Sequence, residues 1–250
     1  MRTKTIRVGY LSDGDAPNIS RDPNTGKIFG IYVDALNNTA QILGLKVDYT
    51  EAVTWGTMIE GLNDGRYDVV PGIWLNTQRG AAADLSKPLL YFAVGGYVRP
   101  NDHRFDTNQN NINDKSIRIA TIDGEQSDLI ARSLFPNATR ISLPQNADLS
   151  QLLLSVSQNK ADVTFTDTSN AGVYLKSNPG TVRNLNVNKP LEVFPSTYMV
   201  RKGEEQFLSL LNTSVDETIN TGQAELLIKK YETTPGSLYA PSFPYRSIDQ

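Results

Sequence analysis

The chain has 250 residues, with 24 Lys and Arg against 27 Asp and Glu, and a formal net charge of −3. This balance lacks the basic excess that binding to a phosphate backbone needs, so we expect no nucleic-acid partner. The absence of Cys excludes thiolate metal sites and disulfides, and a single imidazole, His103, leaves almost nothing from which to build a catalytic triad or a multi-histidine metal site.

Strand and helix patterns alternate through the first half of the chain. Alternating apolar residues predict strands over 5–11, 46–49 and 68–70, and apolar residues at helical spacing predict helices over 31–43 and 58–62. The polar segment 12–27 between the first strand and the first helix is predicted as a loop. This order indicates an α/β lobe with a largely parallel sheet.

The second half repeats the scheme. Strands are predicted over 117–122, 140–143 and 162–165, and helices over 127–134 and 149–156. The segment GRYDVV at 65–70 matches NKADVT at 159–164, and each follows a helix and leads into a buried strand. We therefore expect two lobes of similar topology, with Asp68 and Asp162 in structural positions that fix turns.

Two extended segments, 88–99 and 189–201, are predicted to cross between the lobes. They return the end of the chain to the first lobe, where helices are expected over 207–219 and 224–231, followed by an extended tail on the surface from residue 233 onwards. The expected fold is α/β, with lobe 1 formed by residues 1–92 and 194–250, lobe 2 by residues 93–193, and a ligand cleft between lobes that close about a two-strand hinge.

No segment approaches the ~20 consecutive apolar residues that span a bilayer, and no apolar core of a signal peptide follows the charged start of the chain. Either a cytoplasmic protein or an exported protein whose signal sequence is absent is consistent with these features. His103 lies in a polar segment and is expected in a surface loop.

The ordered set of short motifs resembles the type II periplasmic solute-binding proteins of polar amino-acid ABC transporters, family 3 of the bacterial extracellular solute-binding proteins. The resemblance covers about residues 5–231, and its motifs are GIYVDAL at 30–36, LGLKV at 43–47, TW at 54–55, LNDGRYDVV at 62–70, TQR at 77–79, DLSKP at 84–88, NKADV at 159–163 and LLIKKY at 226–231. It implies a Venus-flytrap receptor in the periplasm or anchored by a lipid, monomeric, without cofactor or metal and without enzymatic activity. Such a receptor closes on an amino acid or a related small polar solute and presents it to the membrane permease.

The resemblance also implies roles for three residues. Arg79 would bind a ligand carboxylate, Asp167 a ligand ammonium, and Trp55 would pack against the ligand. Each residue has an alternative: Arg79 paired with Asp84 or exposed to water, Asp167 as the N-cap of a helix over 168–175, and Trp55 in a core.

Departures from the family pattern lie at three further places. In lobe 1, Trp74 replaces the usual Thr or Ser after the segment that contains Gly72, and Asp15 replaces an aromatic residue before Pro17. In lobe 2, acidic or amide side chains replace a small hydroxyl pair. The candidate ligand-binding residues of lobe 2 are therefore Glu125, Gln126 and Ser127. The acids and indoles together suggest a cation-favouring site for a basic amino acid, a betaine-like compound or another amine. The alternative is that Asp15 and Glu125 are solvated and the ligand is an ordinary amino acid.

Two other functions stay open at this point. A small lyase resembling cyclohexadienyl dehydratase would use Asp167, Glu125 or Asp15 as a general acid or base, which requires a pKa raised by burial. A sensory module of a larger receptor would bind a ligand in the same way and pass the signal to another domain. We favour the transport receptor.

Overall fold

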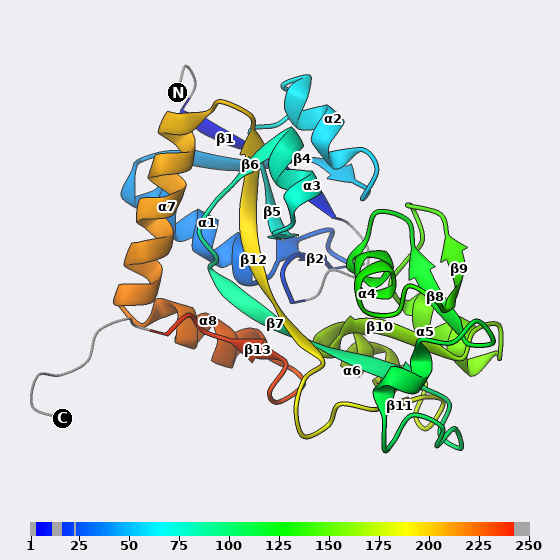
Figure 1. Ribbon diagram of the computed structural model, residues 1–250. Helices are drawn as coiled ribbons and strands as arrows, with labels where there is room; N and C mark the ends of the chain where they lie inside the picture. Colours follow the sequence, from blue (N-terminus) through cyan, green and yellow to red (C-terminus); the bar gives the residue numbers. More distant parts are fainter. Residues whose placement is uncertain (1–3, 12–16, 23, 243–250) are drawn as a thin grey trace, which may run out of the picture.

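The computed structural model describes residues 4–11, 17–22 and 24–242. Most of its described strands form one continuous sheet that runs through two α/β lobes, in the order β4 (Lys46–Val53), β1 (Thr5–Leu11), β5 (Val69–Trp74), β12 (Glu192–Arg201), β7 (Leu90–Val98), β10 (Val163–Asp167), β8 (Arg118–Ile122) and β9 (Thr139–Leu143). Figure 1 shows one lobe at the upper left and the other at the lower right, with two long strands running between them. This arrangement confirms the predicted fold of two lobes on a two-strand hinge.

Lobe 1 is built on β1 (Thr5–Leu11), which pairs in parallel with β4 (Lys46–Val53) on one side and β5 (Val69–Trp74) on the other. The helices α1 (Ile31–Ile42) and α2 (Met58–Asn63) follow the predicted ones closely. The helix α3 (Thr77–Ala82) and the short strands β2 (Ser20–Arg21), β3 (Ile28–Phe29) and β6 (Ala83–Leu85) were not predicted.

Lobe 2 has the same topology. Its central strand β8 (Arg118–Ile122) pairs in parallel with β9 (Thr139–Leu143) and β10 (Val163–Asp167). The other elements are the 3-10 helix η1 (Gln109–Ile112), the helices α4 (Gln126–Leu134), α5 (Ser150–Ser157) and α6 (Thr168–Ser177), and the short strand β11 (Arg183–Asn184). The prediction that the two halves of the chain repeat one scheme is therefore confirmed.

The hinge consists of β7 (Leu90–Val98) and β12 (Glu192–Arg201). These strands pair with each other in antiparallel register from Leu90 with Ser196 to Val94 with Glu192. Beyond this stretch β7 continues into lobe 2, where it pairs with β10, and β12 continues into lobe 1, where it pairs with β5. The expected lobe boundaries at residues 92 and 194 fall inside the mutually paired stretch and stay a prediction.

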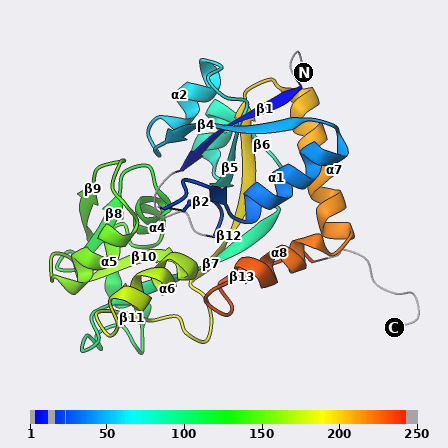
Figure 2. The same ribbon diagram turned by 180° about the vertical axis from the view of Figure 1, so that it is seen from behind.

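The C-terminal helices α7 (Glu205–Asn220) and α8 (Gln223–Tyr231) return to lobe 1, where α8 packs against α1, as seen from behind in Figure 2. The tail that follows is extended, but its described part is not wholly on the surface. The short strand β13 (Leu238–Tyr239) pairs with β7, and Ser237 and Leu238 are buried. The prediction of a surface tail is wrong here because the free edge of the hinge strand offers hydrogen bonds to β13.

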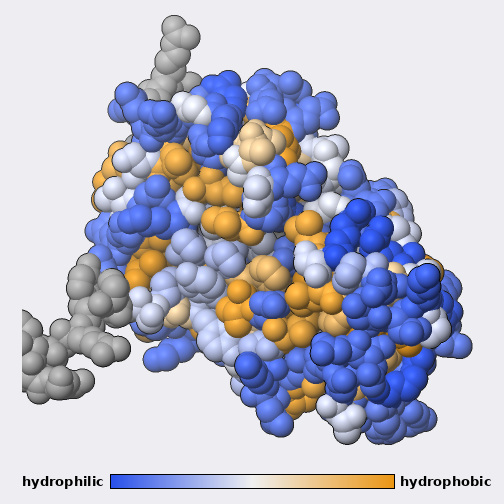
Figure 3. All heavy atoms as spheres, viewed as in Figure 1, coloured by the Kyte–Doolittle hydropathy of each residue, from blue (hydrophilic) through white to orange (hydrophobic). Residues whose placement is uncertain are grey.

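Polar residues cover most of the face shown in Figure 3, and apolar residues appear between them mainly in its middle, over the hinge. Within the described part of the chain no helix is long and apolar enough to cross a membrane. The largest buried cluster continues through both lobes, from Ile6 and Val8 in β1 to Ile119 in β8 and Phe165 in β10.

The two matching segments before β5 and β10 form matching ion pairs. Asp68 accepts hydrogen bonds from the backbone and guanidinium of Arg7, with distances of 2.8 Å to the backbone nitrogen and 2.7 Å to Nη2. Asp162 accepts in the same way from Arg118, at 2.9 Å from the backbone nitrogen and 3.0 Å from Nε. The two aspartates thus fix the turns before their strands, as the repeated sequence predicted.

The two pairs differ in burial and in the number of partners. The side chain of Asp162 is 8% exposed and also accepts from Arg99 and Arg104, whereas that of Asp68 is 29% exposed. Burial alone would raise the pKa of Asp162, but hydrogen bonds from Arg118, Arg104 and Arg99 hold it well below its usual range.

We therefore expect Asp162→Ala to lower the free energy of unfolding by about 3 kcal/mol, because it leaves several partly buried guanidinium groups without their acceptor. Asp68→Ala, at a more exposed pair, is expected to cost only about 1 kcal/mol. Urea unfolding of both variants measures the difference, and equal losses would contradict this assignment.

Candidate functional site

The predicted site residues lie where parallel strands of both lobes end. Trp55 follows β4, Arg79 follows β5, Glu125 follows β8 and Asp167 is the last residue of β10. In open α/β sheets, ligands bind outside the carboxyl ends of the strands, because the helix N-termini and loops gather there. The two lobes present these ends to each other.

Arg79 is buried and connects the two lobes. Asn76 caps the short helix α3 by accepting from the Arg79 backbone nitrogen, which places the guanidinium next to the end of β5. Nη1 donates to the Trp74 carbonyl at 2.8 Å, and Nη2 reaches across to the Gly124 carbonyl of lobe 2 at 3.2 Å. The alternative of an arginine exposed to water is wrong, because Arg79 is only 5% exposed, and so is that of a pair with Asp84, which pairs with Lys202.

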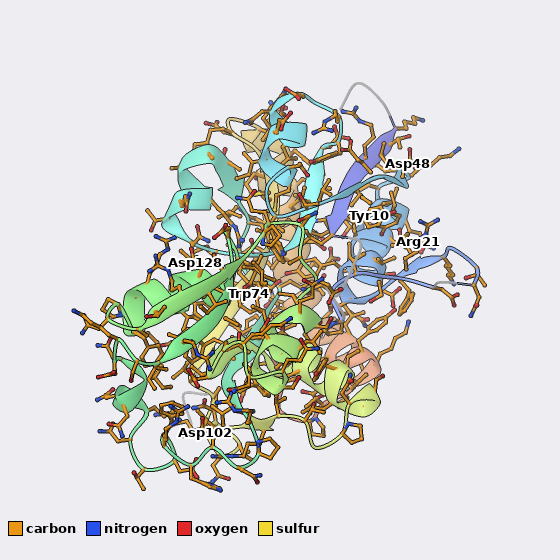
Figure 4. All side chains as sticks on the ribbon, turned by 90° about the vertical axis from the view of Figure 1, so that its right-hand side faces the viewer. Tyr10, Arg21, Asp48, Trp74, Asp102 and Asp128 are labelled. Carbon is orange, nitrogen blue, oxygen red and sulfur yellow. The ribbon has the colours of Figure 1, made fainter. Side chains whose placement is uncertain are left out.

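The two tryptophans have different surroundings. Trp55 is half-buried, lies under the Arg79 guanidinium at 5.4 Å, and packs against a core cluster of each lobe. Trp74 lies in the middle of the molecule (Figure 4) and stacks on Phe194 of β12, with ring centres 5.4 Å apart. Trp55 therefore bridges the lobes, and Trp74 packs directly on the hinge.

Gly72 lies two residues before Trp74, within β5. Its φ of +79° is a conformation that favours glycine, and it stands where the register between β5 and β12 shifts. This bulge sets the direction in which the end of β5, with Trp74, leaves the sheet.

Glu125 is buried at the start of α4. Its carboxylate caps the helix by accepting from the Ser127 backbone nitrogen at 2.7 Å and from the Ser127 hydroxyl at 2.6 Å. Burial raises the pKa of Glu125, while these hydrogen bonds and the charge of Arg79 oppose the increase. The expectation that Glu125 is a solvated loop acid is therefore wrong.

Two neighbours of Glu125 were also predicted as ligand-binding residues. The Ser127 hydroxyl accepts from the Ile122 backbone nitrogen as well as donating to Glu125, so it is already used twice. The side-chain oxygen of Gln126 is buried and has no hydrogen-bond partner among the described residues.

Asp167 caps α6, as its alternative role predicted. It accepts from the backbone nitrogen of Asn170 at 2.8 Å and from the Asn170 side-chain amide at 2.6 Å. Burial, with a contribution from the charge of Glu125, raises the pKa of Asp167 to about 6 despite these hydrogen bonds. The ligand role of Asp167 stays a prediction, and it is compatible with the cap because a carboxylate can accept several hydrogen bonds.

A second contact joins the lobes beside Trp55. A Cβ atom added to Gly56 would lie 2.0 Å from the side-chain oxygen of Gln145, which belongs to the loop after β9. The end of the Gln145 side chain would have to move to admit a Cβ at this position, so the lobes are in close contact here.

The remaining predictions concern residues elsewhere. Asp15 lies outside the described residues. His103 is exposed and hydrogen-bonded to Asp106, as expected for a surface loop. In the described part of the chain, no group of His, Asp and Glu side chains is arranged to hold a metal ion.

Sequence reasoning did not identify Asn170, Gln145 or Phe194. Asn170 stands three residues after Asp167, the spacing of a capping partner, and this signal was available. No local pattern marks Gln145 or Phe194, since their importance comes from contacts with distant segments.

Comparisons with known proteins show the family and the fold of this chain. The model of the bacterial extracellular solute-binding proteins, family 3, matches residues 6–234. The L-cystine-binding protein TcyA of Bacillus subtilis is 30% identical over 86% of this chain and 76% of its own length, and a probable histidine-binding protein of Campylobacter jejuni is 23% identical over 92% and 86%. The crystal structure of an ancestral amino acid-binding protein, a precursor of cyclohexadienyl dehydratase, superimposes with a TM-score of 0.76 at 24% identity, covering 91% of this chain and 95% of that one.

The raised pKa of Asp167 has a consequence for stability. An aspartate whose pKa is higher in the folded than in the unfolded chain makes the folded state less stable as pH rises from about 4 to about 6, and the loss persists above that range. We therefore expect Asp167→Asn, which can still cap α6, to be more stable than the wild type at pH 7, by at most about 3 kcal/mol, and to lose this advantage near pH 4.

Thermal unfolding without ligand at both pH values measures this effect. Asp162→Asn is the matched control at the other end of the same strand, and it should be destabilised at pH 7 because the pKa of Asp162 is lowered in the folded state. A loss of stability in Asp167→Asn at pH 7 would show that its charge is well solvated or paired.

Proposed function

The chain belongs to the bacterial extracellular solute-binding proteins of family 3, and we propose that it is the substrate-binding component of an ABC importer for an amino acid or a related small polar solute. Relatives of this chain are named as histidine-binding, L-cystine-binding and amino-acid ABC transporter-binding proteins. Members of the family are extracellular or periplasmic, and we place this protein there, either in the periplasm or outside the cell and anchored to the membrane by a lipid.

One observation carries the proposal: groups from both lobes meet on the side of the hinge where the parallel strands end. The Arg79 guanidinium of lobe 1 bonds to the Gly124 carbonyl of lobe 2, and Trp55 packs against apolar clusters of both lobes. A site divided in this way is complete only when the lobes are together. This division supports a function in which the protein captures its ligand by closing the two lobes.

We assign the ligand contacts to residues of both lobes. Trp55 and Trp74 would supply aromatic faces, Arg79 and the backbone at Gly72 would contribute from the end of β5, and lobe 2 would contribute Asp167, Glu125, Gln126 and Ser127. Asp167 is the assigned acceptor for a ligand ammonium, because it is a buried carboxylate at a strand end with oxygen lone pairs beyond those used by Asn170.

Closure follows from differential binding. The open form presents half of the contacts to a ligand, and the closed form presents both halves, so a bound ligand shifts the equilibrium toward the closed form. The paired stretch of β7 and β12 is where the backbone bends during this motion. In this proposal a single chain suffices, and the membrane permease recognises the closed form.

A lyase is the second candidate, and one observation favours it. An acid whose pKa is about 6, such as Asp167, suits general acid or base catalysis near neutral pH, and the ancestral protein with this fold preceded a dehydratase. The two bonds from Asn170 already explain the position of Asp167 as a helix cap, so we retain binding without catalysis. Turnover of prephenate or arogenate by the purified protein would reverse this choice.

Calorimetry with a panel of amino acids and amines identifies the ligand, and X-ray scattering then tests the mechanism. We expect the radius of gyration to fall when the binding solute saturates the protein, because the lobes spend less time apart. A non-binding solute from the same panel is the control. Identical radii with and without a tightly bound ligand would contradict closure.

A further inference from the structure

Between the lobes, the groups that suit a carboxylate already bind oxygen atoms of the chain itself. A guanidinium and the first backbone N–H groups of a helix are strong partners for an anion. Here the Arg79 guanidinium donates to the carbonyls of Trp74 and Gly124. The N-terminus of α4 and the Ser127 hydroxyl are used by Glu125.

Glu125 therefore occupies the place at the N-terminus of α4 that a ligand carboxylate would otherwise take. Its oxygen atoms accept from the backbone nitrogens of Gln126 and Ser127, and its charge lies within the field of Arg79. An incoming carboxylate would have to displace these bonds or lie beside a buried negative charge. Either course is unfavourable.

The N-terminus of α6 is also capped by a carboxylate of the chain. Asp167 accepts hydrogen bonds from the backbone nitrogens of Ser169 and Asn170 and from the Asn170 side-chain amide. The N-termini of α4 and α6 are thus both capped by carboxylates of the chain. Neither offers its first N–H groups to a ligand anion.

Among the residues that the structure describes, the buried charges at these strand ends are unbalanced: Glu125 and Asp167 carry two carboxylates, and Arg79 carries one guanidinium. A zwitterionic amino acid would leave this imbalance unchanged, whereas a cation without a carboxylate would offset it. Burial raises the pKa of both carboxyl groups, and this is the cost that a bound cation would relieve.

Two buried polar atoms also await a hydrogen-bond partner: the Gln126 oxygen can only accept, which favours a ligand that donates, and the Ser169 hydroxyl can accept or donate. The side-chain oxygen of Gln126 and the hydroxyl of Ser169 are buried, and neither has a hydrogen-bond partner within the described part of the chain. Buried polar atoms are rarely left in this state unless a ligand or water completes them. Both belong to the first turns of the two helices that Glu125 and Asp167 cap.

We propose that the site between the lobes selects organic cations without a free carboxylate, namely amines and guanidines, over the amino acids that carry the same side chain. The inference rests on the proposed function and narrows its solute class. Ammonium or guanidinium groups would donate to Asp167 and Glu125, and the apolar part of the solute would pack against the indole of Trp55 or Trp74. Arg79 then serves as a bridge between the lobes.

Matched pairs of solutes test this selection directly. Agmatine and arginine, cadaverine and lysine, and histamine and histidine differ within each pair only by the carboxylate. We expect the decarboxylated member of at least one pair to bind at least tenfold more tightly by calorimetry at pH 7.5. Tighter binding of the amino acid in every pair that binds would overturn the inference and leave the proposed function standing. Failure of all six solutes and of every amino acid in the wider panel to bind would overturn both.

A substitution at Glu125 isolates the cause. Glu125→Thr removes the carboxylate from the N-terminus of α4 and keeps a capping oxygen. The ratio of the affinities for the amine and for its amino acid should therefore move at least tenfold toward the amino acid. Glu125→Gln keeps the length and a capping oxygen while removing the charge, and it should shift the ratio in the same direction if the threonine variant does not fold. Glu217→Thr, at an exposed position of α7, is the matched control and should leave the ratio unchanged. An unchanged ratio in folded Glu125 variants would refute the role given to this carboxylate.

Discussion

The antiparallel pairing of β7 with β12 is the constraint on which the rest of the structure depends. Five residue pairs, from Leu90 with Ser196 to Val94 with Glu192, hold the two crossing strands together. Because each strand then joins the sheet of a different lobe, the lobes can rotate about this stretch but cannot separate. Trp74 packs on Phe194 and beside Phe92 of the same two strands, so an aromatic side chain at the site is in direct contact with the hinge.

The fold was largely predictable, because its signals are local or repeated. Helix spacing and the strand alternation located most elements to within a residue or two, and the repeated Asp before β5 and β10 indicated two lobes of one topology. The strand β4 extends to Val53 rather than ending near Tyr49, because Thr50, Glu51 and Ala52 continue an edge strand whose exposed face tolerates polar residues. The strand β13 was missed because it forms only by pairing with the distant β7.

The site was predictable only in part. The positions of Arg79 and Trp55 follow from motifs, but their partners do not, since Gly124 and the core of lobe 2 lie far away in the sequence. Glu125 is the clearest example. An acidic residue in a polar, glycine-containing segment is usually solvated, and nothing local indicates that α4 and the opposing lobe bury it. Burial between two lobes is a tertiary property, and the local sequence does not indicate it.

The strand β10 has an aspartate at each end, one with a structural role and one to which we assign a ligand role. Asp162 precedes it and receives hydrogen bonds from Arg99, Arg104 and Arg118, so its charge is offset and stabilises the turn. Asp167 is the last residue of the strand and is buried. Among the described hydrogen bonds it accepts only from neutral donors, and the like charge of Glu125 raises its pKa further. The protein could have neutralised Asp167 as it does Asp162. A buried acid left without a cationic side chain is unfavourable in the free protein, and the imbalance is removed if the cation is the ligand. The same imbalance that lowers stability thus provides the free energy with which a cation would bring the lobes together.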